Sequence, residues 1–229
     1  MSIKIGINGF GRIGRLVFRA LVDQGLLGDK FDVVAINDLV PSDNLAYLLK
    51  YDSTQGRFNG TVEAPTNDSL VVNGHEIKCL AVREGPAALP WGELNVDIVI
   101  ESSGVVSNHE CAHKLCIAGV RKIIITHSSK IVDKTIIFGV NEDSYNNSQD
   151  DVISSSICDA NAVAPVLRLI NDNNNIISGN ITTLHPWLGY QNLSDGPCRS
   201  FAYPGELYEN FSLGRASTES LMPKTTSCV

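Results

Sequence analysis

The sequence predicts an α/β fold in which a doubly wound parallel sheet is covered by helices, and two observations carry this prediction. The first 150 residues alternate short β-branched apolar runs with amphipathic segments, which is typical of parallel strands joined by helical crossovers. The opening run Ile3–Asn8 leads directly into a glycine-rich turn and then into a helical pattern of apolar residues.

The other elements of the predicted sheet follow from the same alternation. Strands are expected at Lys4–Asn8, Phe31–Asn37, Ile98–Glu101, Lys122–Thr126 and Ile136–Phe138. Helices are expected at Arg12–Gln24, Asn44–Tyr51 and Asn108–Ala118. The segment Gly60–Arg83 is expected to form a β-hairpin insertion that turns at Asn73-Gly74.

The turn after the first strand has the spacing of a dinucleotide-binding loop. Gly9-Phe10-Gly11-Arg12-Ile13-Gly14 matches G-x-G-x-x-G, in which the glycines permit the bend, admit a pyrophosphate and bring the helix close to the strand. Asp38 ends the second strand, 24 residues beyond Gly14, where a carboxylate accepts the ribose hydroxyls of NAD. The same charge would repel a 2′-phosphate, so a Rossmann-type domain that binds NAD rather than NADP is favoured.

The pattern changes at Val152. A strand at Val152–Ser155, a helix at Asn161–Asn171 and a strand at Asn180–Leu184 are expected before a long irregular segment. The polar stretch Glu142–Asp151 predicts an exposed connection. We therefore expect an NAD-binding domain over residues 1–149 and a second, α+β domain over residues 150–229.

Composition and charge narrow the class of protein. The formal net charge is −7 and no block of Lys or Arg occurs, which argues against a nucleic-acid surface. No apolar run reaches membrane-spanning length, and Met1 leads into a strand rather than a signal peptide. The six cysteines form no C-x-x-C pair, so reduced thiols in a cytoplasmic protein without a membrane partner are expected.

Several ordered segments together resemble phosphorylating glyceraldehyde-3-phosphate dehydrogenase, along the whole chain. The segments that carry the resemblance are Ile7–Arg15, Ala35–Asp38, Leu49–Phe58, Leu89–Gly92, Ile100–Gly104 and Phe138–Asn141. The resemblance implies NAD as the cofactor and a small-molecule aldehyde as the substrate. It also implies a homo- or hetero-oligomer, because the loop from Gln191 to Gly214 resembles a subunit-contact element.

In this family a cysteine at the start of a helix attacks the aldehyde and a histidine acts as the base. Cys158 and His185, 27 residues apart, occupy these two positions. A helix N-terminus and a nearby imidazole both favour the thiolate form of a cysteine. Taken alone, Cys158 would more often be a buried structural cysteine, and its pairing with His185 and the nucleotide fold favours the catalytic interpretation.

The resemblance also assigns weaker positions one at a time. It places Arg83 near the adenine, Ser129 and Asn141 on the nicotinamide side, Arg215 near the substrate and a neighbouring subunit, and Thr226 at the inorganic phosphate. Without the resemblance, an exposed Arg or Ser is usually only solvated.

Four departures from the family pattern lie around its two anion sites. Ile157 and Asp159 replace a serine and a threonine, Leu188 replaces a further threonine, and Ser227 replaces a glycine. The charge of Asp159 is expected to disfavour the thiolate of Cys158 and to repel phosphate. In a milder alternative, Asp159 is an N-cap or first-turn residue that stabilises its helix. We expect phosphate handling to be weakened or lost.

Members of the family continue well beyond Val229, so the resemblance implies that residues 150–229 are an incomplete, truncated catalytic (substrate) domain. Strands such as Asn180–Leu184 would then lack neighbours, and unpaired strand edges are costly. A partner chain that covers this face, a fragment of a longer enzyme and a degenerate paralogue are three explanations that the sequence leaves open.

The segment from His109 to His113 formally matches the zinc motif H-E-x-x-H, and Cys116 lies one helical turn further on. Zinc binding there is physically possible, because both histidines would share one helix face. The segment lacks the downstream third ligand of a metalloprotease and lies between two expected strands, so no metal site is expected.

These observations predict NAD-dependent oxidation of an aldehyde, glyceraldehyde 3-phosphate or a related sugar-phosphate aldehyde. The reaction would pass through a thiohemiacetal and a thioester on Cys158, with His185 as the base. The chain would then be an enzyme, an NAD-dependent aldehyde dehydrogenase of the glyceraldehyde-3-phosphate dehydrogenase type. The alternative is a catalytically impaired NAD-binding paralogue that acts as a partner or regulatory subunit.

Overall fold

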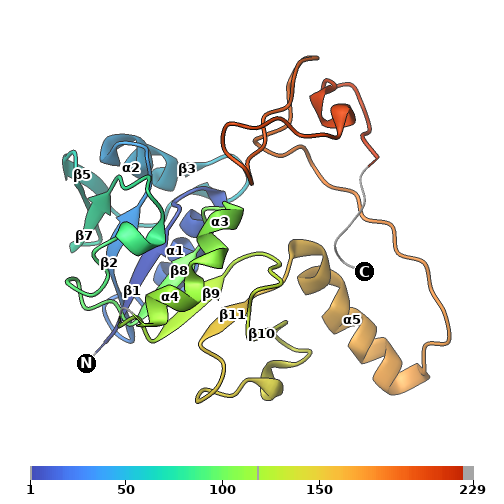
Figure 1. Cartoon of the computed structure of the whole chain (residues 1–229), viewed down its shortest axis with the longest axis horizontal. Helices are drawn as coiled ribbons and strands as arrows, with labels where there is room; N and C mark the ends of the chain where they lie inside the picture. Colours follow the sequence, from blue (N-terminus) through green and yellow to red (C-terminus); the bar gives the residue numbers. More distant parts are fainter. Residues whose placement is uncertain (1, 118, 224–229) are drawn as a thin grey trace.

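The computed structural model of the chain describes residues 2–117 and 119–223, and its centre is a nine-stranded sheet with helices against it (Figure 1). In the described residues the strand order is β10-β11-β9-β8-β1-β2-β7-β6-β5. The strands from β10 to β7 in this order pair in parallel, and β6 and β5 extend the sheet in antiparallel pairs. The predicted α/β class with a doubly wound sheet is confirmed.

The strands of this sheet are β1 Ile3–Asn8, β2 Phe31–Asn37, β5 Val62–Thr66, β6 Ser69–Val72, β7 His75–Leu80, β8 Ile98–Glu101, β9 Lys122–Ile125, β10 Lys134–Thr135 and β11 Val152–Ser154. A separate ribbon pairs β3 Tyr51–Asp52 with β4 Gly56–Arg57. The helices are α1 Arg12–Asp23, α2 Ser42–Lys50, α3 Val106–Glu110, α4 Ala112–Ile117 and α5 Cys158–Asn174. Short 3₁₀ turns occur at Pro86–Ala88, Glu142–Ser144 and Phe211–Gly214.

Two clusters of buried apolar side chains hold the helices on the sheet. One cluster joins Phe18 of α1 and Leu45 of α2 to side chains of the central strands. The other joins Leu115 of α4 and the buried Trp91 to Val99 of β8. Successive side chains of a strand point to opposite faces, so the sheet carries apolar side chains on both, as in other parallel sheets.

The strands β8, β1 and β2 are parallel, so their carboxyl ends lie at one edge of the sheet, and the strand order reverses between β1 and β8. Ligands of open α/β sheets bind at such a switch point. Buried polar side chains lie there: Asn8 Nδ2 donates to Glu101 Oε2 at 2.5 Å, and Asn37 Nδ2 donates to Asn8 Oδ1 at 2.8 Å. This network fixes the ends of three neighbouring strands beneath the glycine-rich turn.

Most element boundaries agree with the sequence to within a few residues, and the differences have local causes. The turn at Asn73-Gly74 is present with φ values of 51° and 83°, the conformation that Asn-Gly favours in two-residue hairpins. Its strand β7 also pairs with β2, so the hairpin extends the main sheet. The strand expected at Ile136–Phe138 lies instead at Lys134–Thr135, where β11 offers its parallel partner.

The strand expected at Asn180–Leu184 is a wrong prediction. Residues 175–188 form no strand or helix, and Ile181 and Leu184 are 53% and 86% exposed. A β-branched run forms a strand only where a neighbouring strand accepts its hydrogen bonds, and this segment leaves α5 as an extended connection (Figure 1). Among the residues described, no helix has both the length and the apolar character needed to cross a bilayer.

Candidate functional site

The glycine-rich turn joins β1 to α1 and has the form of a nucleotide-binding loop. Gly9 has φ +90°, and a Cβ there would lie 2.5 Å from the backbone of Ser103 at the end of β8. A Cβ on Gly14 would lie 2.2 Å from the carbonyl oxygen of Gly9. A Cβ on Gly11 would meet nothing within 4 Å. Two glycines are therefore required by close packing, and the third faces open space at the helix N-terminus.

Asp38 lies beside this open space. Its Oδ2 accepts a hydrogen bond from the backbone N–H of Phe10 at 2.8 Å, and its Oδ1 accepts one from Val40 at 3.2 Å. The carboxylate is thereby fixed next to the glycine turn, where it can accept ribose hydroxyls. The turn supplies backbone N–H groups and the positive end of a helix dipole for a pyrophosphate. The residues present fit NAD.

The weaker cofactor-binding assignments occupy varied environments. Ile13 and Arg12 are exposed at the start of α1, and Arg12 pairs with Asp52 at 3.2 Å. Arg83 is exposed. Ser129 accepts a hydrogen bond from the backbone of Ile131. The contacts of these side chains with a nucleotide stay predictions.

Asn141 has a clear structural task. Its Oδ1 accepts a hydrogen bond from Ile137 N at 2.7 Å, and its Nδ2 donates to Thr135 O at 2.9 Å. Both amide atoms thus close the turn after β10. Its contact with the nicotinamide stays a prediction.

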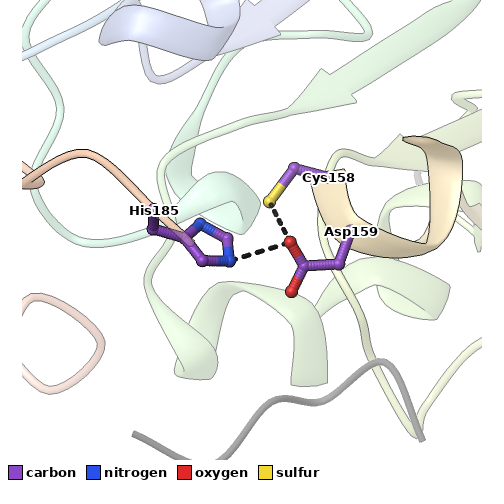
Figure 2. Close-up of side chains that lie close together, drawn as sticks. All are labelled: Cys158, Asp159 and His185. Atoms are coloured by element: carbon purple, nitrogen blue, oxygen red, sulfur yellow. Dashed lines mark hydrogen bonds and ion pairs between the residues drawn. The ribbon is translucent and has the colours of Figure 1, made fainter. Parts of the chain in front are cut away.

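Cys158 and His185 come together although they lie in different segments (Figure 2). Cys158 is the first residue of α5, and His185 belongs to the extended connection that follows this helix. One ligand atom each of Cys158, Asp159 and His185 lies within 4.8 Å of the other two. Ser156, with φ 64°, turns the chain from β11 into α5. A non-glycine residue in this conformation is uncommon and is often found at functional sites.

Asp159 contacts both of the other side chains. Its Oδ1 lies 2.8 Å from Nε2 of His185, and Cys158 Sγ donates to the same oxygen at 3.8 Å. The side chain of Asp159 is 12% exposed and that of His185 is 41% exposed. As the second residue of α5, Asp159 also occupies the first turn, where a carboxylate stabilises the helix. The sequence did not reveal its contact with His185.

This trio can perform nucleophilic chemistry. A thiol at a helix N-terminus with an imidazole nearby can add to a carbonyl carbon and pass a proton to the ring. The carboxylate holds the imidazole in place, and its negative charge opposes an anionic substrate group at the same position.

The substrate-side assignments lie elsewhere or outside the described residues. Arg215 pairs with Asp195 at 2.7 Å within the segment that precedes residue 224. That segment contacts the nucleotide domain, because Val106 N donates to Ala202 O at 3.1 Å and Phe201 lies against Gly104. Thr226 and Ser227 lie outside the described residues.

The H-E-x-x-H segment does not bring its histidines together on one helix. The helical pattern breaks at Cys111, between α3 and α4. His109 is buried against His127, with ring centroids 4.0 Å apart, and His113 pairs with Asp133 at 3.8 Å. Burial and the neighbouring His127 lower the pKa of His109 to about 4. These residues therefore act as separate structural contacts.

Glu101 is a buried acidic residue to which the sequence analysis gave no role, although it lies in an expected strand and in a segment that carries the resemblance. It accepts hydrogen bonds from Asn8 and from the Ser103 backbone, and burial raises the pKa of its carboxyl group. It therefore holds the strand ends and the Ser103 backbone that packs against Gly9. Its place at the carboxyl end of an expected strand of the parallel sheet was the signal that could have revealed this role.

Comparison with known proteins shows which proteins this chain is similar to. Residues 3–109 match the family model described as "Glyceraldehyde 3-phosphate dehydrogenase, NAD binding domain". Over these residues the chain belongs to the glyceraldehyde-3-phosphate dehydrogenase family. It is 43% identical over 227 residues to "Glyceraldehyde-3-phosphate dehydrogenase 1" of a Nostoc species, and the match covers 98% of this chain and 62% of that protein.

Two further relatives give similar values. "Glyceraldehyde-3-phosphate dehydrogenase" of Mycolicibacterium smegmatis is 41% identical over 228 residues, 99% of this chain and 64% of that protein. The protein of the same name from Mycobacterium tuberculosis is 42% identical over 227 residues, 99% of this chain and 64% of that protein. The chain therefore spans less than two thirds of the length of these relatives. The predicted Rossmann-type domain and its NAD cofactor agree with this family.

Proposed function

We propose that the chain oxidises an aldehyde with NAD through a covalent intermediate on Cys158. Glyceraldehyde 3-phosphate or a related sugar-phosphate aldehyde is the proposed substrate. The observation that carries the proposal is the convergence of Cys158 and His185, 27 residues apart, at the N-terminus of α5 in a chain whose first domain binds NAD. The relatives named above are called glyceraldehyde-3-phosphate dehydrogenase, and their similarity extends over nearly the whole of this chain.

In the proposed reaction, Cys158 Sγ forms a bond to the aldehyde carbon while the carbonyl oxygen takes the π-electron pair and a proton. His185 then accepts the hydroxyl proton as the carbon is oxidised, so Cys158 carries the acyl group as a thioester. NAD, when bound, supplies the hydride acceptor. Attack by phosphate or water on the acyl carbon breaks the C–S bond and returns the thiolate.

Asp159 influences which acceptor can attack the acyl group. It holds the ring of His185 through a contact of 2.8 Å between Oδ1 and Nε2 and places a negative charge beside Cys158. An anionic acceptor such as phosphate approaches against that charge, whereas water does not. We therefore propose weakened use of phosphate, in keeping with the replaced hydroxyls at Ile157 and Leu188.

The proposal also includes the organisation of the protein. Residues 1–149 act as the NAD-binding domain and residues 150–229 as the part of the chain that supplies the catalytic side chains. The exposed apolar side chains of α5, such as Leu169 at 66%, support assembly into a homo- or hetero-oligomer. The described cysteines are free thiols, which supports a reducing, cytoplasmic location.

The test is NADH formation from glyceraldehyde 3-phosphate and NAD, measured with and without phosphate. Wild type should turn over and Cys158→Ser should not, while Cys116→Ser, which alters a half-buried cysteine on α4, should keep the activity. Absence of turnover in wild type, together with stabilisation by NAD against heat, would contradict the proposal. That result would favour the catalytically impaired NAD-binding partner instead.

A further inference from the structure

The proposed reaction uses the thiol and the imidazole directly, whereas the carboxylate that contacts both of them only holds the imidazole in place. Asp159 Oδ1 is 2.8 Å from His185 Nε2 and 3.8 Å from Cys158 Sγ. Sulfur, nitrogen and oxygen ligand atoms therefore converge from two segments of the chain, all within 4.8 Å of one another. Such a set of side chains is the donor set of a transition-metal site.

The spacing of these atoms is close to that of a tetrahedral zinc site. Zinc binds thiolate sulfur at about 2.3 Å, imidazole nitrogen at about 2.0–2.1 Å and carboxylate oxygen at about 2.0–2.2 Å, so neighbouring ligands stand about 3.3–3.7 Å apart. The distances of 2.8 Å and 3.8 Å to Asp159 bracket that range. The third separation, between Cys158 Sγ and the His185 ring nitrogen, is at most 4.8 Å, so a side-chain rotation of about 1 Å brings it into that range.

We propose that Cys158, Asp159 and His185 form a Zn²⁺ site with three protein ligands and one open position for water. A thiolate, an imidazole and one carboxylate favour zinc over Mg²⁺ or Ca²⁺, which take oxygen ligands. Cys158 and His185 are exposed, so the ion reaches the site from solvent. Binding releases the Cys158 thiol proton to solvent and forms a Zn–S bond.

The site has a functional consequence that rests on the proposed function. A zinc-bound Cys158 sulfur has its lone pair engaged and cannot add to an aldehyde, and a zinc-bound His185 nitrogen cannot accept a proton. Zinc would therefore act as a reversible inhibitor. Asp159, which stands where the family pattern has a threonine, is the third ligand.

The binding test uses Co²⁺ as a spectroscopic probe for the same ligands, followed by displacement with Zn²⁺. The wild-type chain should bind one Co²⁺ with a thiolate-to-cobalt charge-transfer band, and Cys158→Ser should lose the band. Asp159→Asn, which keeps the shape but removes the charge, should weaken binding at least about tenfold, since even the loss of a group behind a metal ligand costs 10–100-fold. Circular dichroism should show that both variants are folded.

The chain offers a matched control in its second His–Asp pair. His113 lies 3.8 Å from Asp133, and Cys116 is on the same helix, α4, as His113. Cys116→Ser should leave the cobalt spectrum and the affinity unchanged. A missing charge-transfer band in wild type, an unchanged affinity in Asp159→Asn or a loss of the band in Cys116→Ser would each overturn the proposal.

The metal-binding measurements do not depend on turnover, so they can refute the zinc site without refuting the proposed dehydrogenase activity, and the reverse also holds. Zn²⁺ should also protect Cys158 from alkylation by iodoacetamide in wild type, and a chelator should restore the reaction. In Asp159→Asn the same protection should need at least about tenfold more zinc. Alkylation of Cys158 at an unchanged rate in saturating zinc would contradict the site even in a chain without catalytic activity.

Discussion

Gly11→Ala separates nucleotide binding from folding more sharply than any other change in the glycine-rich turn. Gly11 has φ −66° and ψ −161°, a conformation that alanine adopts without strain. A Cβ there meets no atom within 4 Å, so the folded chain accommodates the methyl group. The methyl group occupies the open space at the N-terminus of α1, where the pyrophosphate of NAD would lie.

The expected magnitudes follow from these contacts. A compatible Gly→Ala change stabilises a protein by about 0.4–1 kcal/mol, which raises the melting temperature of a chain of this size by about 1–4 °C. NAD at about 100 times its Kd stabilises wild type by about 2.7 kcal/mol, or about 5–11 °C. If the methyl group lowers affinity about 100-fold, the same NAD concentration stabilises the variant by about 0.4 kcal/mol.

Thermal melting with and without NAD measures both effects, and Gly14→Ala is the matched control. A Cβ on Gly14 would lie 2.2 Å from the Gly9 carbonyl oxygen, and such overpacking costs about 1–3 kcal/mol. Gly14→Ala should therefore melt lower without NAD, whereas Gly11→Ala should not. A Gly11→Ala chain that keeps the full NAD-induced shift would refute the assignment of this space to the pyrophosphate.

Two other predictions concern charge. Asp159→Asn removes the negative charge 3.8 Å from Cys158 Sγ, so iodoacetamide should alkylate Cys158 faster than in wild type. Mass spectrometry measures the rate of alkylation, and an unchanged or slower rate would contradict this prediction. His109 is 3% exposed and has its pKa lowered to about 4 by burial and by His127, so its contribution to stability is complete above the ordinary pKa of about 6.5 and is lost as the pH falls toward 4. Relative to wild type, the free energy of unfolding of His109→Phe should therefore rise by about 3 kcal/mol when the pH is lowered from 7 to 4, as measured by urea unfolding. A difference in this free energy that does not vary with pH would be evidence against this role.

The sequence predicted those parts of the molecule that depend on local chemistry. Close packing requires glycine at Gly9 and Gly14, and Asp38 lies at a spacing that the βαβ unit determines. The nucleotide-binding turn was therefore predictable from the sequence. The hairpin at Asn73-Gly74 was equally local. The pairing partner of a strand is not a local property. The strand expected at Asn180–Leu184 is absent because no neighbouring strand within residues 2–117 and 119–223 accepts its hydrogen bonds.

The candidate catalytic site was predicted in part. The resemblance supplied Cys158 and His185, and the structure brings them together. It could not supply the contact between His185 and Asp159, because that contact depends on how the extended connection after α5 returns to the start of the helix. The same applies to His109, whose partner His127 comes from the segment after β9 rather than from its own helix.

The central claim is that Cys158 carries the acyl group, and trapping that group tests it most directly. The chain is mixed with glyceraldehyde 3-phosphate and NAD without phosphate, quenched in acid and analysed by peptide mass spectrometry. The account predicts one NADH per active chain in the first turnover and a mass increase equal to the acyl group on the Cys158 peptide. NADH formation without this modification, or the modification on another cysteine such as Cys116, would contradict it.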